Sequence, residues 1–220
     1  MTREVFTFDA KDFLTSARSA FVSANGFTEH NNKHRRMMDL SEEVLSDILP
    51  SVRPIAIVSS YGSEALTGDT ITADAGFEFA SPAFSQFDQE RIRHIYPFML
   101  TVGDVKTSLE GITARVFADM WATVFCDVIV AALSEKLTAP ITIYPGFYGL
   151  PLSNILQFSK LLDGEKIGIS VREPGFIMLP VKSCCGLMFE AVGQLPLQED
   201  SCEECMANRH WCIMCKKNRV

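Results

Sequence analysis

The longest regular pattern of apolar positions lies in the middle of the chain, over residues 104–137. Apolar side chains recur there at steps of three to five residues, the spacing of one face of an α-helix. They are Val105, Leu109, Ile112, Val116, Met120, Val124 and Ile129, widened by Trp121, Phe125 and Val128. The pattern predicts a long core helix that Gly111 can divide in two. Ala139-Pro140 ends it, because a proline disfavours helical geometry in the residue before it.

Three shorter segments have helical signals. Residues 9–24 place apolar side chains on one helical face, and residues 39–42, Asp-Leu-Ser-Glu, have the spacing of a capping box. The second helix is therefore expected to begin at Asp39 and to end near Leu49, before Pro50. Ser153 is expected to cap a short helix over residues 154–162, closed by Asp163-Gly164.

Other segments have the composition or alternation of strands. They are residues 54–58, parts of residues 70–84, and residues 166–172, 176–179 and 185–192. Strands interspersed with unpaired helices are typical of an α+β fold with a largely antiparallel sheet.

Composition narrows the class of protein. The chain has 220 residues, 47% of them hydrophobic, and a formal net charge of −7. That acidic balance argues against nucleic acid as the main partner, since phosphate binding needs a clustered basic surface. Residues 1–10 lack the apolar run of a signal peptide. The chain is therefore expected in the cytoplasm, where cysteines are thiols or metal ligands.

A membrane span is also not expected. The longest apolar stretch, residues 116–133, contains Asp119 and Asp127. A charge at the bilayer centre costs about 2.5–3.5 kcal/mol on insertion scales. The stretch is interpreted as a buried helix.

Four cysteines lie close together near the end of the chain. Cys202, Cys205, Cys212 and Cys215 form two Cys-x-x-Cys pairs separated by six residues. Four thiolates suit tetrahedral zinc or an iron–sulfur cluster, and the spacing does not choose between them. Free thiols are the alternative without metal. Residues 199–220 are accordingly predicted to be a metal-binding tail.

A series of sequence blocks carries a family resemblance. Gly103-Asp104 leads into the long apolar helix, and the loop YPGFYGLPLS follows at residues 144–153. Next come FSKLLD at 158–163, IGI at 167–169 and MLPVKSCCG at 178–186. In this order and spacing the blocks resemble the activation (reactivation) domain of vitamin B12-dependent methionine synthase. Residues 104–191 match well, and residues 1–103 match loosely.

The resemblance implies a fold and a function. The fold is one α+β domain over residues 1–198, with a twisted, largely antiparallel sheet and long helices. In that family the domain docks over a cobalamin-carrying domain and binds S-adenosylmethionine. After inactive Co(II) has been reduced by an external donor, the methyl group of S-adenosylmethionine traps the Co(I). A free-standing member would act in trans on a corrinoid protein or methyltransferase.

The same resemblance supplies candidate cofactor-binding residues and one conflict. The candidates are Tyr144, Gly146, Phe147 and Tyr148 in the loop, Asp127 in the helix and Lys182 in the hairpin. The family's Arg-x-x-x-Gly-Tyr motif has Thr142 at the arginine and Phe147 at the tyrosine, and its helix glutamate falls on Thr123. A lost charge-assisted contact costs about 1.5–3 kcal/mol, so S-adenosylmethionine binding is expected to weaken. No catalytic residue is predicted.

Two functions follow from these features. The first is a corrinoid-associated protein that acts on a partner's cobalamin, with a pocket between residues 144–150 and the hairpin 180–186. The second is a metal-binding interaction or electron-transfer module that keeps the fold without methyl chemistry. The matching loop and hairpin favour the first, and the substitutions at Thr142, Phe147 and Thr123 favour the second.

Overall fold

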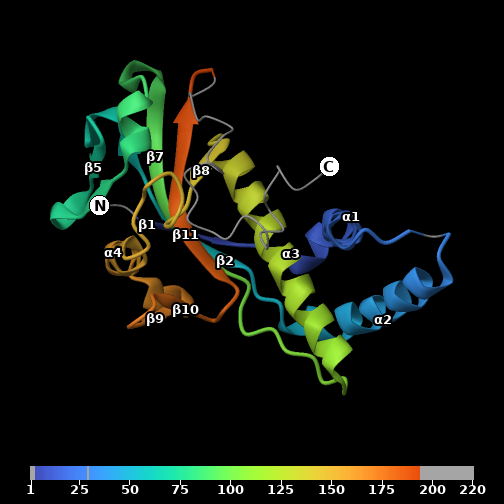
Figure 1. Ribbon diagram of the computed structural model, residues 1–220. Helices are drawn as coiled ribbons and strands as arrows, with labels where there is room; N and C mark the ends of the chain where they lie inside the picture. The colour runs from blue at the N-terminus through green and yellow to red at the C-terminus, as the bar shows by residue number, and fades with distance from the viewer. Residues whose placement is uncertain (1–2, 29, 194–220) are drawn as a thin grey trace.

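The centre of the structure is an antiparallel sheet built around two long strands, β7 (Ile92–Thr101) and β11 (Ser183–Ala191). The computed structural model describes residues 3–28 and 30–193 (Figure 1). In this part of the chain the sheet has six strands in the order β1-β2-β7-β11-β8, with β3 also paired to β7. The other four strands are β1 (Arg3–Thr7), β2 (Ile55–Ser59), β3 (Tyr61–Gly62) and β8 (Ile141–Ile143). The predicted α+β fold with a largely antiparallel sheet is confirmed.

Successive side chains of the two long strands point to alternate faces of the sheet. Apolar side chains on each face belong to a hydrophobic core, so the sheet lies between two cores. In β7, Phe98 and Leu100 face one core and Met99 faces the other. In β11, Met188 joins the first core and Leu187 the second. Successive side chains of a strand point to opposite faces, so each long strand stabilises both layers.

Pro97 explains why β7 is not recognised from the sequence. Proline cannot donate to a ladder and is normally confined to edge strands. Here it faces Leu187 of β11, while on the other side the β2 pairing stops at Phe98 and the β3 pairing begins at Ile95. The proline thus occupies the break between two partner strands.

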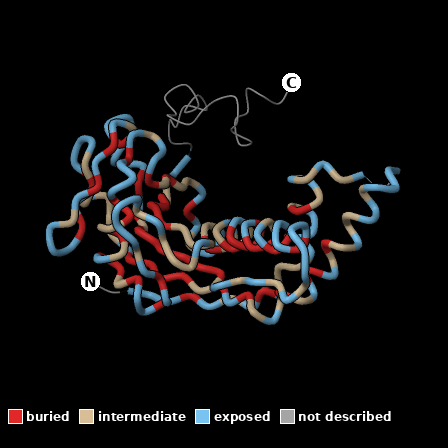
Figure 2. Tube along the Cα trace, turned by 60° about the horizontal axis from the view of Figure 1, so that its bottom comes forward, coloured by how far each residue is buried: buried red, intermediate tan, exposed pale blue. Residues whose placement is uncertain are grey.

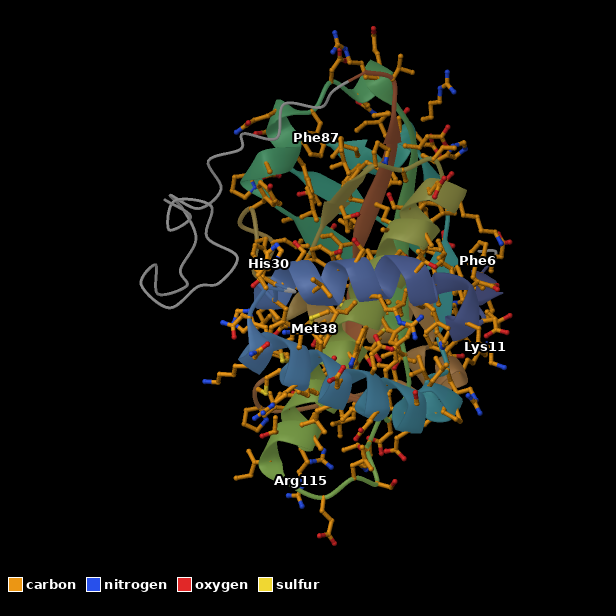
Figure 3. The ribbon with its side chains drawn as sticks, turned by 90° about the vertical axis from the view of Figure 1, so that its right-hand side faces the viewer. Phe6, Lys11, His30, Met38, Phe87 and Arg115 are labelled. Carbon is orange, nitrogen blue, oxygen red and sulfur yellow. The ribbon has the colours of Figure 1, made fainter. Side chains whose placement is uncertain are left out.

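The first core is covered by three helices, α1 (Leu14–Asn25), α2 (Asn32–Ile48) and α3 (Ile112–Lys136). Trp121 and Phe125 of α3 are buried, and the Trp121 ring stacks on Phe21 of α1 at 3.9 Å between centroids. The Trp121 Nε1–H donates to the Ser41 carbonyl of α2 at 2.9 Å. Figure 3, seen from the helical side, shows α1 and α2 lying across α3.

The predicted start of the long helix is wrong by eight residues. Residues 104–111 form no helix, and α3 begins at Ile112 after Gly111, whose φ is 104°. That backbone region suits glycine and stops the helix from extending backwards. The end near residue 137 is confirmed, with Leu137 as the C-cap. Val128 is half-buried, against the burial expected for it.

Helix α3 is also long and apolar enough to cross a membrane by length and composition, the one such helix in the described residues. Half of its apolar window is buried in the structure, and its inner face supplies the first core. Packing against α1, α2 and the sheet accounts for its apolar character. Figure 2 shows buried residues running through α3 and the strands, with exposed turns on α2.

Each of the other predicted helices needs a correction. Of residues 9–24, only those from Leu14 onward are α-helical, after a 3-10 turn at Ala10–Phe13. Helix α2 begins at Asn32, seven residues before the predicted start, because Asn31 is the N-cap and accepts hydrogen bonds from the backbone of Lys33 and His34. Asp39 therefore lies inside the helix. Helix α4 (Asn154–Leu162) has the predicted bounds, but the Ser153 side chain makes no capping hydrogen bond.

The second core is covered by α4 and by a small sheet of β4 (Leu66–Thr67), β5 (Thr70–Thr72) and β6 (Glu78–Ala80). Phe158 of α4 stacks on Phe79 of β6 at 4.4 Å. The strand expected over residues 166–172 is much shorter, since residues 164–167 form a 3-10 turn and Gly168 has φ 76°. Only β9 (Ser170–Arg172) remains, paired with β10 (Ile177–Leu179).

Candidate functional site

The outer face of α3 carries a stripe of exposed residues. Ile112 and Val116 are 81% and 48% exposed, and Asp119, Thr123 and Asp127 continue the stripe at steps of three or four residues. Residues at these spacings lie on one side of a helix. The face opposite Trp121 and Phe125 is thus apolar in its first turns and polar toward its middle.

Lys182 connects this stripe to the segment before β11. Its Nζ lies 2.9 Å from Asp119 Oδ1 and donates to Thr123 Oγ1, also at 2.9 Å. The Thr123 hydroxyl in turn donates to the Asp119 carbonyl at 3.0 Å. The Lys182 side chain is 22% exposed and that of Asp119 is 64% exposed, so the ion pair lies at the surface.

The backbone around Lys182 is held by the end of β7. The Val102 amide donates to the Lys182 carbonyl at 3.2 Å, and the Ser183 hydroxyl donates to Thr101 Oγ1 at 2.9 Å. These bonds place residues 180–183 beside the chain that leaves β7 at Gly103. The ammonium group of Lys182 therefore extends to α3 from a fixed backbone.

A groove runs between α3 and residues 103–107, and it is called the α3 groove below. One part, of about 210 Å³, is lined by Gly103, Asp104, Val105, Asp119, Ala122, Val181 and Lys182. A neighbouring part, of about 310 Å³, shares Val105 and Asp119 and extends to Lys106, Thr107, Arg115 and Ala118. Figure 3 shows Arg115 near one end of α3. Both basic and acidic side chains line the groove, beside the exposed Val181.

Asp47 of α2 holds the wall of the groove opposite α3. Its Oδ2 accepts hydrogen bonds from Thr107 Oγ1 and from the Ser108 amide, both at 2.7 Å, and its Oδ1 accepts from Ser108 Oγ at 2.6 Å. The hydrogen bonds from Ser108 and Thr107 keep the pKa of this carboxyl below its ordinary value. These bonds hold Thr107 and Ser108, and with them the segment 104–111, against α2.

Farther along α3, two thiols lie close to a tyrosine hydroxyl and a carboxylate. The Cys126 thiol donates to the sulfur of Cys184 in β11, with 3.7 Å between the Sγ atoms. Burial raises the pKa of the nearby Tyr144 hydroxyl above its ordinary range, and Cys184, Cys126 and Asp127 act in the same direction. Partial burial also raises the pKa of Asp127, while the charge of Lys182 lowers it. The Asp127 side chain itself is exposed at the surface.

The structure brings together some of the predicted cofactor-binding residues. Asp127, Lys182 and Tyr144 share one electrostatic neighbourhood. Phe147 is 50% exposed, and its ring lies edge-on to Tyr144 at 6.5 Å. Gly146 has φ 90° in the same loop, and its amide donates to the Leu150 carbonyl at 2.7 Å.

Tyr148 lies apart from this group. It packs against the second core, on the opposite face of the sheet from Tyr144, and its carbonyl accepts a hydrogen bond from Ser81. Thr142 of β8 pairs with Met188 of β11 in the sheet. Of the two candidate tyrosines, Tyr144 packs against the same core as α3, and Tyr148 packs against the other.

The four cysteines expected to bind metal, Cys202, Cys205, Cys212 and Cys215, lie outside the described residues. Within residues 3–28 and 30–193, no group of three or more His, Cys, Asp or Glu side chains is placed to hold a metal ion. The metal site therefore stays a prediction from the sequence.

Sequence reasoning did not propose several groove residues. It expected a pocket between the loop 144–150 and the hairpin 180–186. Val181 and Lys182 do line the groove, whereas its other lining residues come from α3 and residues 103–107. The available signal for Asp119 was its place as a charged residue in the apolar stretch 116–133. The contact between Cys126 and Cys184 had no such signal, because 57 residues separate them in the sequence.

Comparison with known proteins supports the fold. The sequence matches no established family profile and no curated protein. The structure is similar to a solved structure described as the crystal structure of the MetH reactivation domain bound to AdoHcy, with a TM-score of 0.65 and 11% sequence identity. The similarity covers 88% of this chain and 80% of that one. At this identity the likeness establishes the shared fold.

Proposed function

We propose that this chain docks on a corrinoid-carrying protein and acts on its cobalamin in trans. The observation that carries the proposal is the fold shared with the MetH reactivation domain over 88% of the chain. In the family that the sequence resembles, the domain docks over a separate cobalamin-carrying domain. The partner is therefore expected to be a corrinoid protein or methyltransferase.

The surface beside α3 supports this kind of partner. Three apolar side chains are exposed there: Val116 is 48% exposed, Phe147 50% and Val181 67%. The ion pair of Lys182 and Asp119 adds polar groups next to Val181. A mixture of apolar anchors and a charged rim is typical of a non-obligate protein interface.

S-adenosylmethionine is the second element of the proposal. The fold is shared with a domain crystallised with AdoHcy, which differs from S-adenosylmethionine by the transferable methyl group. Thr142 and Phe147 cannot supply the guanidinium and hydroxyl of the family motif. We therefore expect binding to be weaker than millimolar in the isolated chain. Titration calorimetry measures it, and sub-millimolar binding would show that Tyr144 and Lys182 compensate.

The alternative function is a metal-binding interaction or electron-transfer module. Its support is the spacing of Cys202, Cys205, Cys212 and Cys215 together with the substituted motif. An iron–sulfur cluster on the tail would fit electron delivery to Co(II), and a zinc ion would fit a structural role. Metal analysis of anaerobically purified protein separates these two cases.

The test of docking is a binding measurement against corrinoid proteins encoded in the same genome, each loaded with cobalamin. The unmodified chain is expected to bind one of them, and F147A and V181S are expected to weaken that binding at least tenfold. Val5, which is 49% exposed in the edge strand β1, provides the control variant V5S. Equal affinity for all three variants would place the interface elsewhere on the molecule, and no binding to any loaded corrinoid protein would contradict the proposal.

A further inference from the structure

Two thiols from different layers of the fold lie in contact. Cys126 belongs to α3 and Cys184 to β11, and their Sγ atoms are 3.7 Å apart. A disulfide bond requires about 2.05 Å between the sulfurs. Closing the remaining distance of roughly 1.7 Å is within the reach of side-chain rotation and a small movement of the two backbones.

The neighbouring Cys185 does not compete for the same partner. It faces the second core and is 2% exposed, whereas Cys184 packs against the first core beside Cys126. Adjacent residues of a strand point to opposite faces, so the sheet itself separates Cys185 from Cys126. The fold therefore selects one pair among the three described cysteines.

We propose that Cys126 and Cys184 form a reversible disulfide that joins α3 to β11. The oxidant is a low-molecular-weight disulfide such as glutathione disulfide. One protein thiolate attacks a sulfur of the oxidant and releases one glutathione, giving a mixed disulfide. The second protein thiol then attacks that protein sulfur, loses its proton and releases the second glutathione. The two cysteines are oxidised, one glutathione disulfide is reduced to two glutathiones, and excess glutathione reverses the exchange.

The bond would act directly on the walls of the candidate site. Cys126 immediately precedes Asp127, and Cys184 lies two residues after Lys182. Drawing the two sulfurs together fixes the segment before β11, which carries Lys182, against the helix that carries Asp119 and Asp127. The inference stands on the thiol geometry and does not depend on the proposed function.

The surroundings of Cys184 determine how the protein has to be oxidised in the test. The hydrogen bond from Cys126 and burial raise the pKa of Cys184 well above its ordinary value, and Asp127 and Cys185 contribute in the same direction. Thiolate is the attacking species, so exchange at this sulfur is slow at neutral pH. The protein is therefore equilibrated in glutathione buffers of defined ratio until the product no longer changes.

The experiment maps disulfides in the full chain. After equilibration and alkylation of free thiols, combined cleavage after Lys, Arg and Glu releases residues 116–135 with Cys126 and residues 183–190 with Cys184 and Cys185. Mass spectrometry is expected to find these two peptides joined, with the loss of two hydrogens, in oxidising buffer and separate in excess glutathione. The tail cysteines fall in other peptides.

Two variants identify which cysteine of the peptide 183–190 forms the bond. C185A is expected to retain the joined peptides, and C184A is expected to lose them. Wild-type peptides that stay separate at every buffer ratio, or a cross-link that persists in C184A, would overturn the proposal. The mapping of the unmodified chain needs no substitution, so a folding defect in one variant leaves the test intact. The oxidised protein is also expected to melt at a higher temperature than the reduced protein, a difference absent from C184A.

Discussion

Lys182 Nζ lies 2.9 Å from Asp119 Oδ1, which links the segment before β11 to the outer face of α3. An exposed ion pair of this kind contributes about 0–1 kcal/mol to stability, because solvent screens it. The pair also borders the α3 groove. The ion pair is therefore expected to affect what the groove binds more than it affects the stability of the fold.

Replacing Lys182 by methionine is expected to raise the pKa of Asp127. The charge of Lys182 lowers that pKa at present, against the effect of burial. Carboxyl-carbon NMR titration of the wild type and K182M measures the shift. K106M is the matched control, because Lys106 pairs with Asp104 in the same groove at 2.6 Å. An unchanged Asp127 in K182M, or equal shifts in both variants, would contradict this arrangement.

Asp47→Ala is expected to release residues 104–111 and lower the melting temperature at pH 7. The pKa of Asp47 is lower in the folded protein than in the unfolded chain. Its stabilising contribution is therefore complete above the unfolded pKa of about 3.9 and is lost as the pH falls through the folded pKa. The difference between the wild type and D47A should shrink as the pH is lowered from 7 to 3.

Asp39 provides the control for that comparison. It is exposed on the same helix, α2, and D39A is expected to change the melting temperature little. A difference between the wild type and D47A that stays constant from pH 7 to pH 3 would show that the charged form of Asp47 is not the stabilising one.

Phe125→Ala is expected to destabilise the first core strongly. Phe125 is fully buried in α3, and large-to-small changes of this type cost about 3–5 kcal/mol. At about 2–4 °C per kcal/mol for a chain of this size, the melting temperature should fall by roughly 6–20 °C. F147A also removes a phenyl ring, but from a half-exposed position, so it should lower the melting temperature far less. Similar losses in calorimetric scans of both variants would contradict the packing described for α3.

The cysteine tail is tested by metal content. C205S and C212S together should release the metal expected at Cys202, Cys205, Cys212 and Cys215 and leave the main domain folded, because its two cores lie upstream. Metal affinity should also fall as the pH is lowered, since protons compete for the thiolates. Full metal content in the double variant would show that these cysteines are not the ligands.

The sequence predicted the parts of the fold in which local pattern and tertiary packing agree. The apolar repeat of α3, the bounds of α4 and the strand near residues 185–192 are such parts. It failed where distant contacts decide the backbone. Asp47 fixes residues 104–111 from another helix, and β7 accepts Pro97 because two separate strands flank it.

The candidate site was likewise predicted only in part. The family resemblance pointed to Asp127, Tyr144 and Lys182, which the fold brings into one neighbourhood. It also pointed to Tyr148, which faces the other core. Asp119 and Thr123 both contact Lys182, and these contacts depend on how β11 packs beside α3.

The central claim is that the chain acts on the cobalamin of another protein, and the cobalt itself reports it most directly. The measurement is the electron paramagnetic resonance spectrum of a Co(II)-loaded corrinoid protein, recorded alone and with an excess of this chain under anaerobic conditions. Docking over the cobalamin is expected to change the cobalt signal, and this change should reach a plateau as more of the chain is added. F147A should need a higher concentration than V5S to produce the same change. A spectrum that stays unchanged at saturating concentrations, for every corrinoid protein encoded in the same genome, would contradict the claim.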